Sequence, residues 1–101
     1  LFIQLFIKNN KSLIDFYIIP MDTNIESLKI ANELRDSGYK VEIEMNKRKL
    51  KKSLDFANKE KIPYVIIIGD EEIKKGILNI KDMLNNTGFE IDLSNIKNIK
   101  L

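Results

Sequence analysis

Residues 63–69 read Pro-Tyr-Val-Ile-Ile-Ile-Gly, an apolar, β-prone run that predicts a strand buried on both faces. The proline stands at the first position of the run, where its missing N–H costs least, and the glycine ends it. A second run of this kind, Phe-Tyr-Ile-Ile at residues 16–19, is stopped by Pro20. Strands that are apolar on both faces belong to parallel sheets covered by helices, so the chain is predicted to be an α/β domain.

A helix is predicted between these two strands. Thr23 and Glu26 form a capping-box pattern, and Gly38 stands where a helix ends in a left-handed residue. Apolar residues recur at helical spacing between them, and the stripe that we expect to be buried consists of Ile25, Leu28, Ala31 and Leu34.

A strand and a second helix are predicted next. Residues 40–45 alternate between polar and apolar types, which indicates a strand with one buried face and one wet face. Asn46 is the expected N-cap of a helix over residues 47–59, whose buried stripe would be Leu50, Leu54 and Ala57.

The last third of the chain predicts a hairpin followed by a helix. Residues 70–75 form one expected helical turn before Gly76, and strands are expected at residues 77–80 and 89–91, joined by a turn at residues 85–88. The final helix would be capped by Asp92 or Ser94 and would bury Leu93, Ile96 and Ile99. This order of elements implies parallel strands with right-handed crossovers and a closing hairpin, hence a mixed sheet.

Composition excludes several kinds of chemistry. The 101 residues suffice for one domain, and 17 Lys and Arg against 15 Asp and Glu give a formal net charge of +2. With no Cys and no His, the usual zinc sites, thiol catalysis, disulfides and imidazole acid–base chemistry are ruled out. No apolar run reaches the roughly 18 residues of a membrane span, and no membrane partner is expected.

Enzymatic interpretations find little support in the motifs. None of the four glycines lies in a phosphate-binding loop, which disfavours a nucleotide-binding, flavodoxin-like domain. Pro20 and Met21 stand where a receiver domain of two-component signalling would carry its acidic cluster. Asp70, Glu71 and Glu72 could hold Mg²⁺, but we expect a solvated acidic first turn that the helix dipole favours. No catalytic residue and no metal ligand is predicted.

The sequence Lys47-Arg48-Lys49-Leu50-Lys51-Lys52 places five cations among six residues at the predicted start of a helix. Each cation there opposes the helix dipole by a few tenths of a kcal/mol, up to about 1 kcal/mol. Concentrated positive charge beside free N–H groups suits an anion such as a phosphate backbone. A solvated charged face is the plain alternative, and the low net charge favours a local RNA-binding patch over general coating of nucleic acid.

The order of these segments resembles the anticodon-binding domain of class II aminoacyl-tRNA synthetases, and within it the C-terminal domain of histidyl-tRNA synthetases. The resemblance covers about residues 15–96. Its motifs are Asp15-Phe16-Tyr17-Ile18-Ile19-Pro20, then residues 31–42, 49–57 and 63–72, and finally Gly76 with Ile80-Lys81-Asp82-Met83.

The resemblance implies a three-layer α/β/α fold with a five-stranded mixed sheet, and the gripping of a tRNA anticodon stem-loop. The cations of residues 47–52 would hold loop phosphates. By position in that fold, Glu44 and Asn46, and Glu72 and Lys81 beside the Gly76 loop, are expected to read base edges, although ordinary surface placement is an equal alternative for these four. Tyr39 and Phe89 could stack a base, but we expect both to pack.

The same resemblance sets expectations for the whole protein. Residues 1–14 are interpreted as a linker or the remnant of a preceding catalytic domain, and residues 15–101 as the anticodon-binding domain. The domain alone would be non-catalytic and bind no cofactor. ATP and Mg²⁺ are expected only in the catalytic domain of a parent ligase, a cytoplasmic homodimer. The alternative is a protein-interaction or regulatory module on the same fold, in which exposed Ile and Leu residues matter instead of cations.

Overall fold

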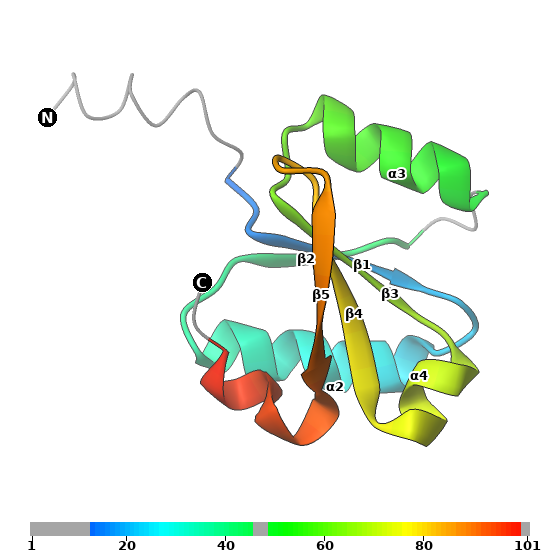
Figure 1. Cartoon of the computed structure of the whole chain (residues 1–101), viewed down its shortest axis with the longest axis vertical. Coiled ribbons are helices and arrows are strands. Elements are labelled where there is room, and N and C mark those ends of the chain that lie inside the picture. The colour runs from blue at the N-terminus through cyan, green and yellow to red at the C-terminus, as the bar shows by residue number, and fades with distance from the viewer. Residues whose placement is uncertain (1–12, 46–48, 100–101) are drawn as a thin grey trace, which may run out of the picture.

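The computed structural model describes residues 13–45 and 49–99 (Figure 1). The elements are, in chain order, β1 (Phe16–Pro20), α2 (Asn24–Asp36), β2 (Val41–Ile43), α3 (Leu50–Lys59), β3 (Tyr64–Ile68), α4 (Asp70–Lys75), β4 (Ile77–Asp82), β5 (Thr87–Asp92) and the 3₁₀ helix η1 (Leu93–Asn98). No helix in this described part is both long and apolar enough to cross a membrane.

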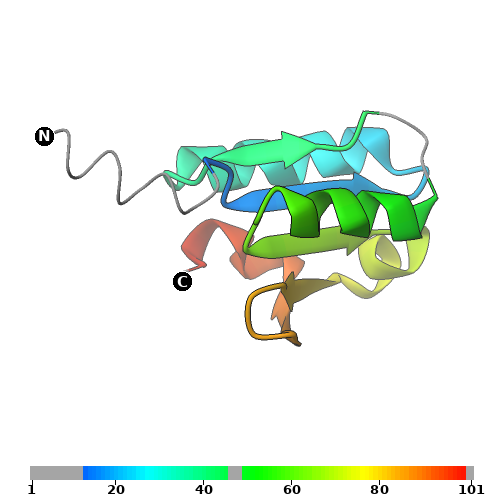
Figure 2. The ribbon, with the colours of Figure 1, turned by 90° about the horizontal axis from the view of Figure 1, so that it is seen from above.

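The strands form one five-stranded sheet in the order β2-β1-β3-β4-β5. β1 pairs in parallel with β2 and with β3, whereas β4 runs antiparallel to β3 and to β5. The predicted mixed sheet and its closing hairpin are therefore confirmed. Since β1 lies between β2 and β3, the two connecting helices lie on opposite faces: α2 covers one and α3 the other (Figure 2).

Two hydrophobic clusters divide the core between these faces. Phe16 and Ile18 of β1 belong to the cluster beneath α2 and η1, and the alternate residues Tyr17 and Ile19 belong to the cluster beneath α3. A strand points successive side chains to opposite faces, so an apolar run supplies both clusters at once. The three-layer α/β/α arrangement follows from this division.

The start of α2 differs from its prediction. Thr23 is the N-cap residue but makes no side-chain cap hydrogen bond; its buried hydroxyl donates to the Ile68 carbonyl (2.7 Å) and lies 3.1 Å from Ser27 Oγ. The expected capping box with Glu26 is therefore wrong, because a tertiary acceptor holds the hydroxyl.

The buried stripe of α2 is also displaced from the expected one. It consists of Ser27, Ile30, Ala31 and Leu34. Ile25 is 71% and Leu28 49% exposed, because the helix turns the Ser27 face toward the sheet.

The segment after β2 reverses the expected alternation. Glu44 is buried at 8% exposure and Met45 is 85% exposed, whereas the pattern predicted a wet Glu44 and a buried Met45. β2 ends at Ile43, so the chain leaves the strand geometry on which the alternation depends.

The second crossover helix begins later than predicted. α3 starts at Leu50 with Lys49 as its N-cap; the predicted cap, Asn46, lies outside the described residues together with Lys47 and Arg48. Of the expected stripe, Ala57 is buried and Leu50 and Leu54 are half-buried, and Ser53 joins them as a buried residue.

The C-terminal hairpin is longer than predicted. Both strands extend toward a turn in which Asp82 accepts hydrogen bonds from the backbone N–H groups of Leu84 and Asn85 and from the Asn85 side chain. The side-chain bond from Asn85, ahead of the backbone bonds, holds the pKa of Asp82 below its usual range. The last element is a 3₁₀ helix and not an α-helix; Asp92 is its N-cap and makes no side-chain cap bond.

Candidate nucleic-acid interface

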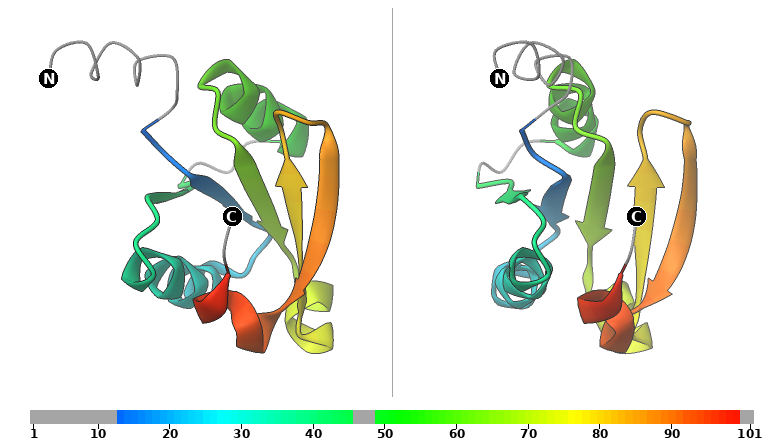
Figure 3. Two further views of the ribbon diagram at one scale, coloured as in Figure 1. Left: turned by 60° about the vertical axis from the view of Figure 1, so that its left-hand side comes forward. Right: turned by 90° about the vertical axis from the view of Figure 1, so that its left-hand side faces the viewer.

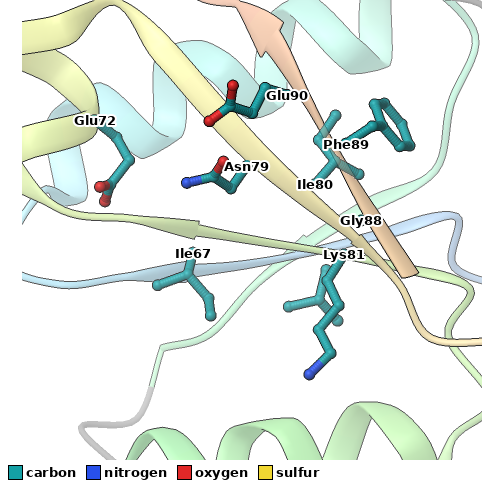
Figure 4. A pocket seen from close by; sticks show the side chains of 9 residues that line it. Ile67, Glu72, Asn79, Ile80, Lys81, Gly88, Phe89 and Glu90 are labelled. Carbon is teal, nitrogen blue, oxygen red and sulfur yellow. The ribbon is translucent and has the colours of Figure 1, made fainter. Parts of the chain in front are cut away.

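One part of the sheet is left open on the α3 face. α3 packs over β1 and β3, and the β4–β5 hairpin projects beside it (Figure 3). A cavity of about 460 Å³ lies there, a size typical of ligand sites (Figure 4). The residues that line it are Val65, Ile67, Glu72, Asn79, Ile80, Lys81, Gly88, Phe89 and Glu90.

The cavity combines an apolar floor with a polar rim. Val65 and Ile67 come from β3, on the same face as the cluster beneath α3. On the hairpin, Asn79 of β4 stands opposite Glu90 of β5 in the strand register. A flat apolar floor edged by an amide and a carboxylate is suited to a nucleobase, whose faces are apolar and whose edge carries hydrogen-bonding groups.

Gly88 keeps the hairpin side of the cavity open. It pairs with Lys81, whose side chain extends from β4 toward α3 (Figure 4). A Cβ at Gly88 would lie 3.3 Å from the Ile80 carbonyl oxygen, so a side chain there would press on the neighbouring strand.

Glu72 enters the rim from α4. Its Oε1 accepts the backbone N–H of Gly69 at 2.6 Å, which caps the first turn of this helix. Asp70 and Glu71, the other two acidic residues of that turn, are exposed as predicted. The carboxylate of Glu72 is therefore held in place by its own helix and also lines the cavity.

Three of the five cations of residues 47–52 lie in the described part of the chain, at the start of α3. Lys49, Lys51 and Lys52 are exposed, and none of them forms an ion pair within residues 13–45 and 49–99. They therefore present positive charge on the outside of the helix layer that covers β1 and β3.

The structure separates the other predicted base-reading residues. Glu72 and Lys81 share the cavity, but Glu44 follows β2 at the far edge of the sheet and lines two smaller hollows of about 280 and 230 Å³. Glu44 is therefore not part of the cavity on the hairpin.

Of the two candidate stacking aromatics, Tyr39 packs as expected, whereas Phe89 is 40% exposed and is among the residues that line the cavity. The Tyr39 ring lies edge-on to Phe16 with centroids 5.2 Å apart, and its hydroxyl donates to the Ile99 carbonyl (3.1 Å). Phe89 lies edge-on to Tyr64 at 6.5 Å, with its ring directed away from the α3 side of the sheet, where Lys81 extends (Figure 4).

Sequence reasoning missed Asn79 and Glu90. Asn79 alternates with buried Leu78 and Ile80, so its strand pattern placed it on the opposite face of the sheet. Only the limited reach of α3 shows that this face is open above β4 and β5. Glu90 comes from β5, most of which is exposed, where alternation gave no signal.

Residues 15–99 match the family described as "Anticodon binding domain". The chain belongs to this family. The anticodon-binding domain is 48% identical over 82 residues to histidine–tRNA ligase 2 of Shouchella clausii, covering 81% of this chain and 19% of that protein. It is 43% identical over 86 residues to the histidine–tRNA ligase of Methanococcus vannielii, covering 81% of this chain and 21% of that one.

Solved structures agree with the sequence matches. The anticodon-binding domain superposes on apo histidyl-tRNA synthetase of S. aureus with a TM-score of 0.77 at 25% identity, covering 84% of this chain and 25% of that one. For histidyl-tRNA synthetase of Nostoc sp. the TM-score is 0.78 at 25% identity, with 86% and 21% covered. The predicted resemblance and fold are confirmed, and the domain corresponds to about a fifth to a quarter of these proteins.

Proposed function

We propose that this domain binds the anticodon stem-loop of a tRNA and performs no chemistry itself. The observation that carries the proposal is the combination of exposed lysines on α3, the helix toward which Lys81 extends, with a cavity that has an apolar floor and a rim of Glu72, Asn79, Lys81 and Glu90 (Figure 4). Contacts with phosphates give affinity and contacts with base edges give selectivity. The α3 lysines would make the phosphate contacts, and the cavity would make the base contacts.

The roles of individual residues follow from their chemistry. Lys49, Lys51 and Lys52 bind phosphates, and we extend this role to Lys47 and Arg48. Glu72 accepts hydrogen bonds from base amino or imino groups, and Lys81 donates to base acceptors such as guanine O6. For Glu44 a base contact would require a second site near β2, separate from the cavity, and for Asn46 we keep base reading as a proposal.

For the whole protein we propose a histidine–tRNA ligase, by its resemblance to relatives of which the domain covers about a fifth. A class II catalytic domain in the same polypeptide would bind ATP and Mg²⁺ and attach the amino acid. The domain would act in the cytoplasm, within a homodimer, by holding the tRNA so that its acceptor end reaches that catalytic domain.

A charge-matched pair of variants tests the phosphate contacts. Lys51→Ala/Lys52→Ala removes two exposed cations from α3, and Lys29→Ala/Lys40→Ala removes two exposed cations elsewhere. Binding of a fluorescent anticodon stem-loop of histidine tRNA is measured by anisotropy over a series of salt concentrations. Each single-strand phosphate contact contributes about −0.7 to the log–log salt slope, so the α3 variant should lose about 1.4 of slope and the control none. Equal slopes in the two variants would refute the role of α3.

A protein-interaction module is the second candidate function, favoured by apolar groups at the β2 edge. Ile25, Leu28 and Met45 are exposed, and Leu28 and Met45 line the hollow of about 230 Å³ with Ile43. If the stem-loop does not bind at low salt and the domain dimerises with increasing concentration in analytical ultracentrifugation, this second function replaces the first.

A further inference from the structure

Gly69 joins β3 to α4 with an ordinary extended backbone, φ −112° and ψ 179°. An L-residue adopts this conformation without strain, so backbone freedom does not explain a glycine here. The space around it does. A Cβ at Gly69 would lie 2.9 Å from Glu72 Oε1, whereas the next nearest side-chain atom, Met21 Cβ, would be at 3.9 Å. Among the residues that the structure describes, the only close conflict is with the carboxylate of Glu72.

That carboxylate is held by the same residue. The Gly69 N–H donates to Glu72 Oε1 at 2.6 Å, a short, charge-assisted bond. Of the two carboxylate oxygens, only Oε1 accepts a hydrogen bond within the described residues. The other, Oε2, keeps its lone pairs for a group that enters the cavity. The Asn79 amide points toward Glu72 across the cavity (Figure 4).

We propose that Gly69 is a positioning residue: by lacking a Cβ it lets Glu72 fold back onto the helix cap, so that Oε2 faces the cavity as an acceptor for an N–H on an RNA base edge. The base contact rests on the proposed function; the link between Gly69 and Glu72 stands apart from it. A carboxylate already fixed in its binding orientation loses little rotamer entropy when the base arrives, which strengthens binding. Asn79, opposite it, offers the same base a donor and an acceptor.

An experiment without RNA tests the link between the two residues. In Gly69→Ala the methyl group displaces the Glu72 carboxylate, so the amide of residue 69 loses its acceptor and exchanges faster with solvent in hydrogen-exchange NMR. Glu72→Gln keeps a side-chain oxygen that can accept the same N–H, so its residue 69 amide remains protected. Equal protection in wild type and Gly69→Ala would overturn the proposal.

Binding of the histidine-tRNA anticodon stem-loop tests the consequence through a double-mutant cycle. Loss of a charge-assisted hydrogen bond weakens binding roughly tenfold, and this is expected for Gly69→Ala and for Glu72→Gln alike. In the double variant Gly69→Ala should add nothing, because it acts only through Glu72. Glu71→Gln, which removes a neighbouring exposed carboxylate outside the cavity, is the matched control and should bind at least as well as wild type.

Each outcome of the cycle separates the inference from the proposed function. The positioning role is overturned if Gly69→Ala binds the stem-loop as tightly as wild type, or if the losses of affinity in the double variant are additive. RNA binding by the domain stands in either case. If the wild-type chain binds no stem-loop, the proposed function fails and the base contact with it, whereas the exchange measurement still decides the Gly69–Glu72 link. Stem-loops are also made with inosine in place of guanosine, one position at a time. If the tenfold effect of Glu72→Gln disappears at one position, the guanine amino group at that position is the donor.

Discussion

Replacing Thr23 with valine removes one hydroxyl from a buried contact that ties α2 to the end of β3. The Thr23 hydroxyl donates to the Ile68 carbonyl at 2.7 Å and lies 3.1 Å from Ser27 Oγ, and both side chains are buried. Valine matches threonine in shape, so no cavity forms. The Ile68 carbonyl also accepts the Met21 N–H at 2.8 Å and remains hydrogen-bonded in the variant.

The cost of Thr23→Val therefore has two parts. The lost hydrogen bond is worth about 1 kcal/mol, and the Ser27 hydroxyl, left buried without its partner, adds about 1 kcal/mol. We expect the free energy of unfolding to fall by about 2 kcal/mol and Tm by roughly 10 °C for a domain of this size. Since Ile68 directly precedes Gly69, the amide of Gly69 should also exchange faster in the variant.

Urea unfolding of Thr23→Val, Ser27→Ala and the double variant tests this reasoning. Ser27→Ala removes the hydroxyl that Thr23→Val leaves without a partner. The free energy of unfolding of the double variant should therefore exceed the value predicted from the sum of the two single changes by about 1 kcal/mol. The hydroxyl contact is not a stabilising one if the free energy of unfolding of Thr23→Val lies within about 0.5 kcal/mol of the wild-type value. Strictly additive losses of stability in the double variant would show the same.

Two further predictions concern other polar groups. Ser53 is fully buried on α3 and its hydroxyl has no hydrogen-bond partner among the described residues, so Ser53→Ala should raise the free energy of unfolding by about 0.5–1 kcal/mol in urea; a loss would contradict this. Asn85→Ala should raise the pKa of Asp82 toward its usual value in a ¹³C carboxyl titration, and an unchanged titration would refute the role of the amide. Because the folded-state pKa of Asp82 is lowered, its bond to Asn85 stabilises the fold above the usual aspartate range, and the stability gap between wild type and variant should close as pH falls through that lowered pKa.

The local sequence pattern predicts an element correctly where one interaction dominates its structure. The apolar runs at residues 16–19 and 63–68 predicted buried strands, because a segment apolar on both faces is stable only between two layers. The helical segment before Gly38 was predicted for a similar reason, and Gly38 has the left-handed φ of 98° expected where that helix ends. These signals lie within a few residues of one another along the chain.

The local sequence pattern gives a wrong prediction where tertiary structure overrides the local signal. The Thr23 hydroxyl could cap its own helix or reach Ile68, 45 residues away, and the tertiary acceptor was preferred. At Glu44 and Met45 the polar–apolar alternation of the sequence continues past the end of β2, since the strand ends at Ile43 and no feature of the sequence marks that end.

The amino-acid sequence by itself determined the class of fold, the family, and the residue types available for binding RNA: lysines and carboxylates, without histidine or cysteine. The tertiary structure alone decided which of them form a site. Asn79 and Glu90 become neighbours only through the register of the hairpin, and Glu72 joins them from α4, where its carboxylate folds back onto the Gly69 N–H. Glu44 is excluded from that cavity because β2 lies at the other edge of the sheet. The physical reason is that periodicity tells which face of a strand a side chain occupies, whereas the order of strands and the reach of α3 determine which part of that face remains open.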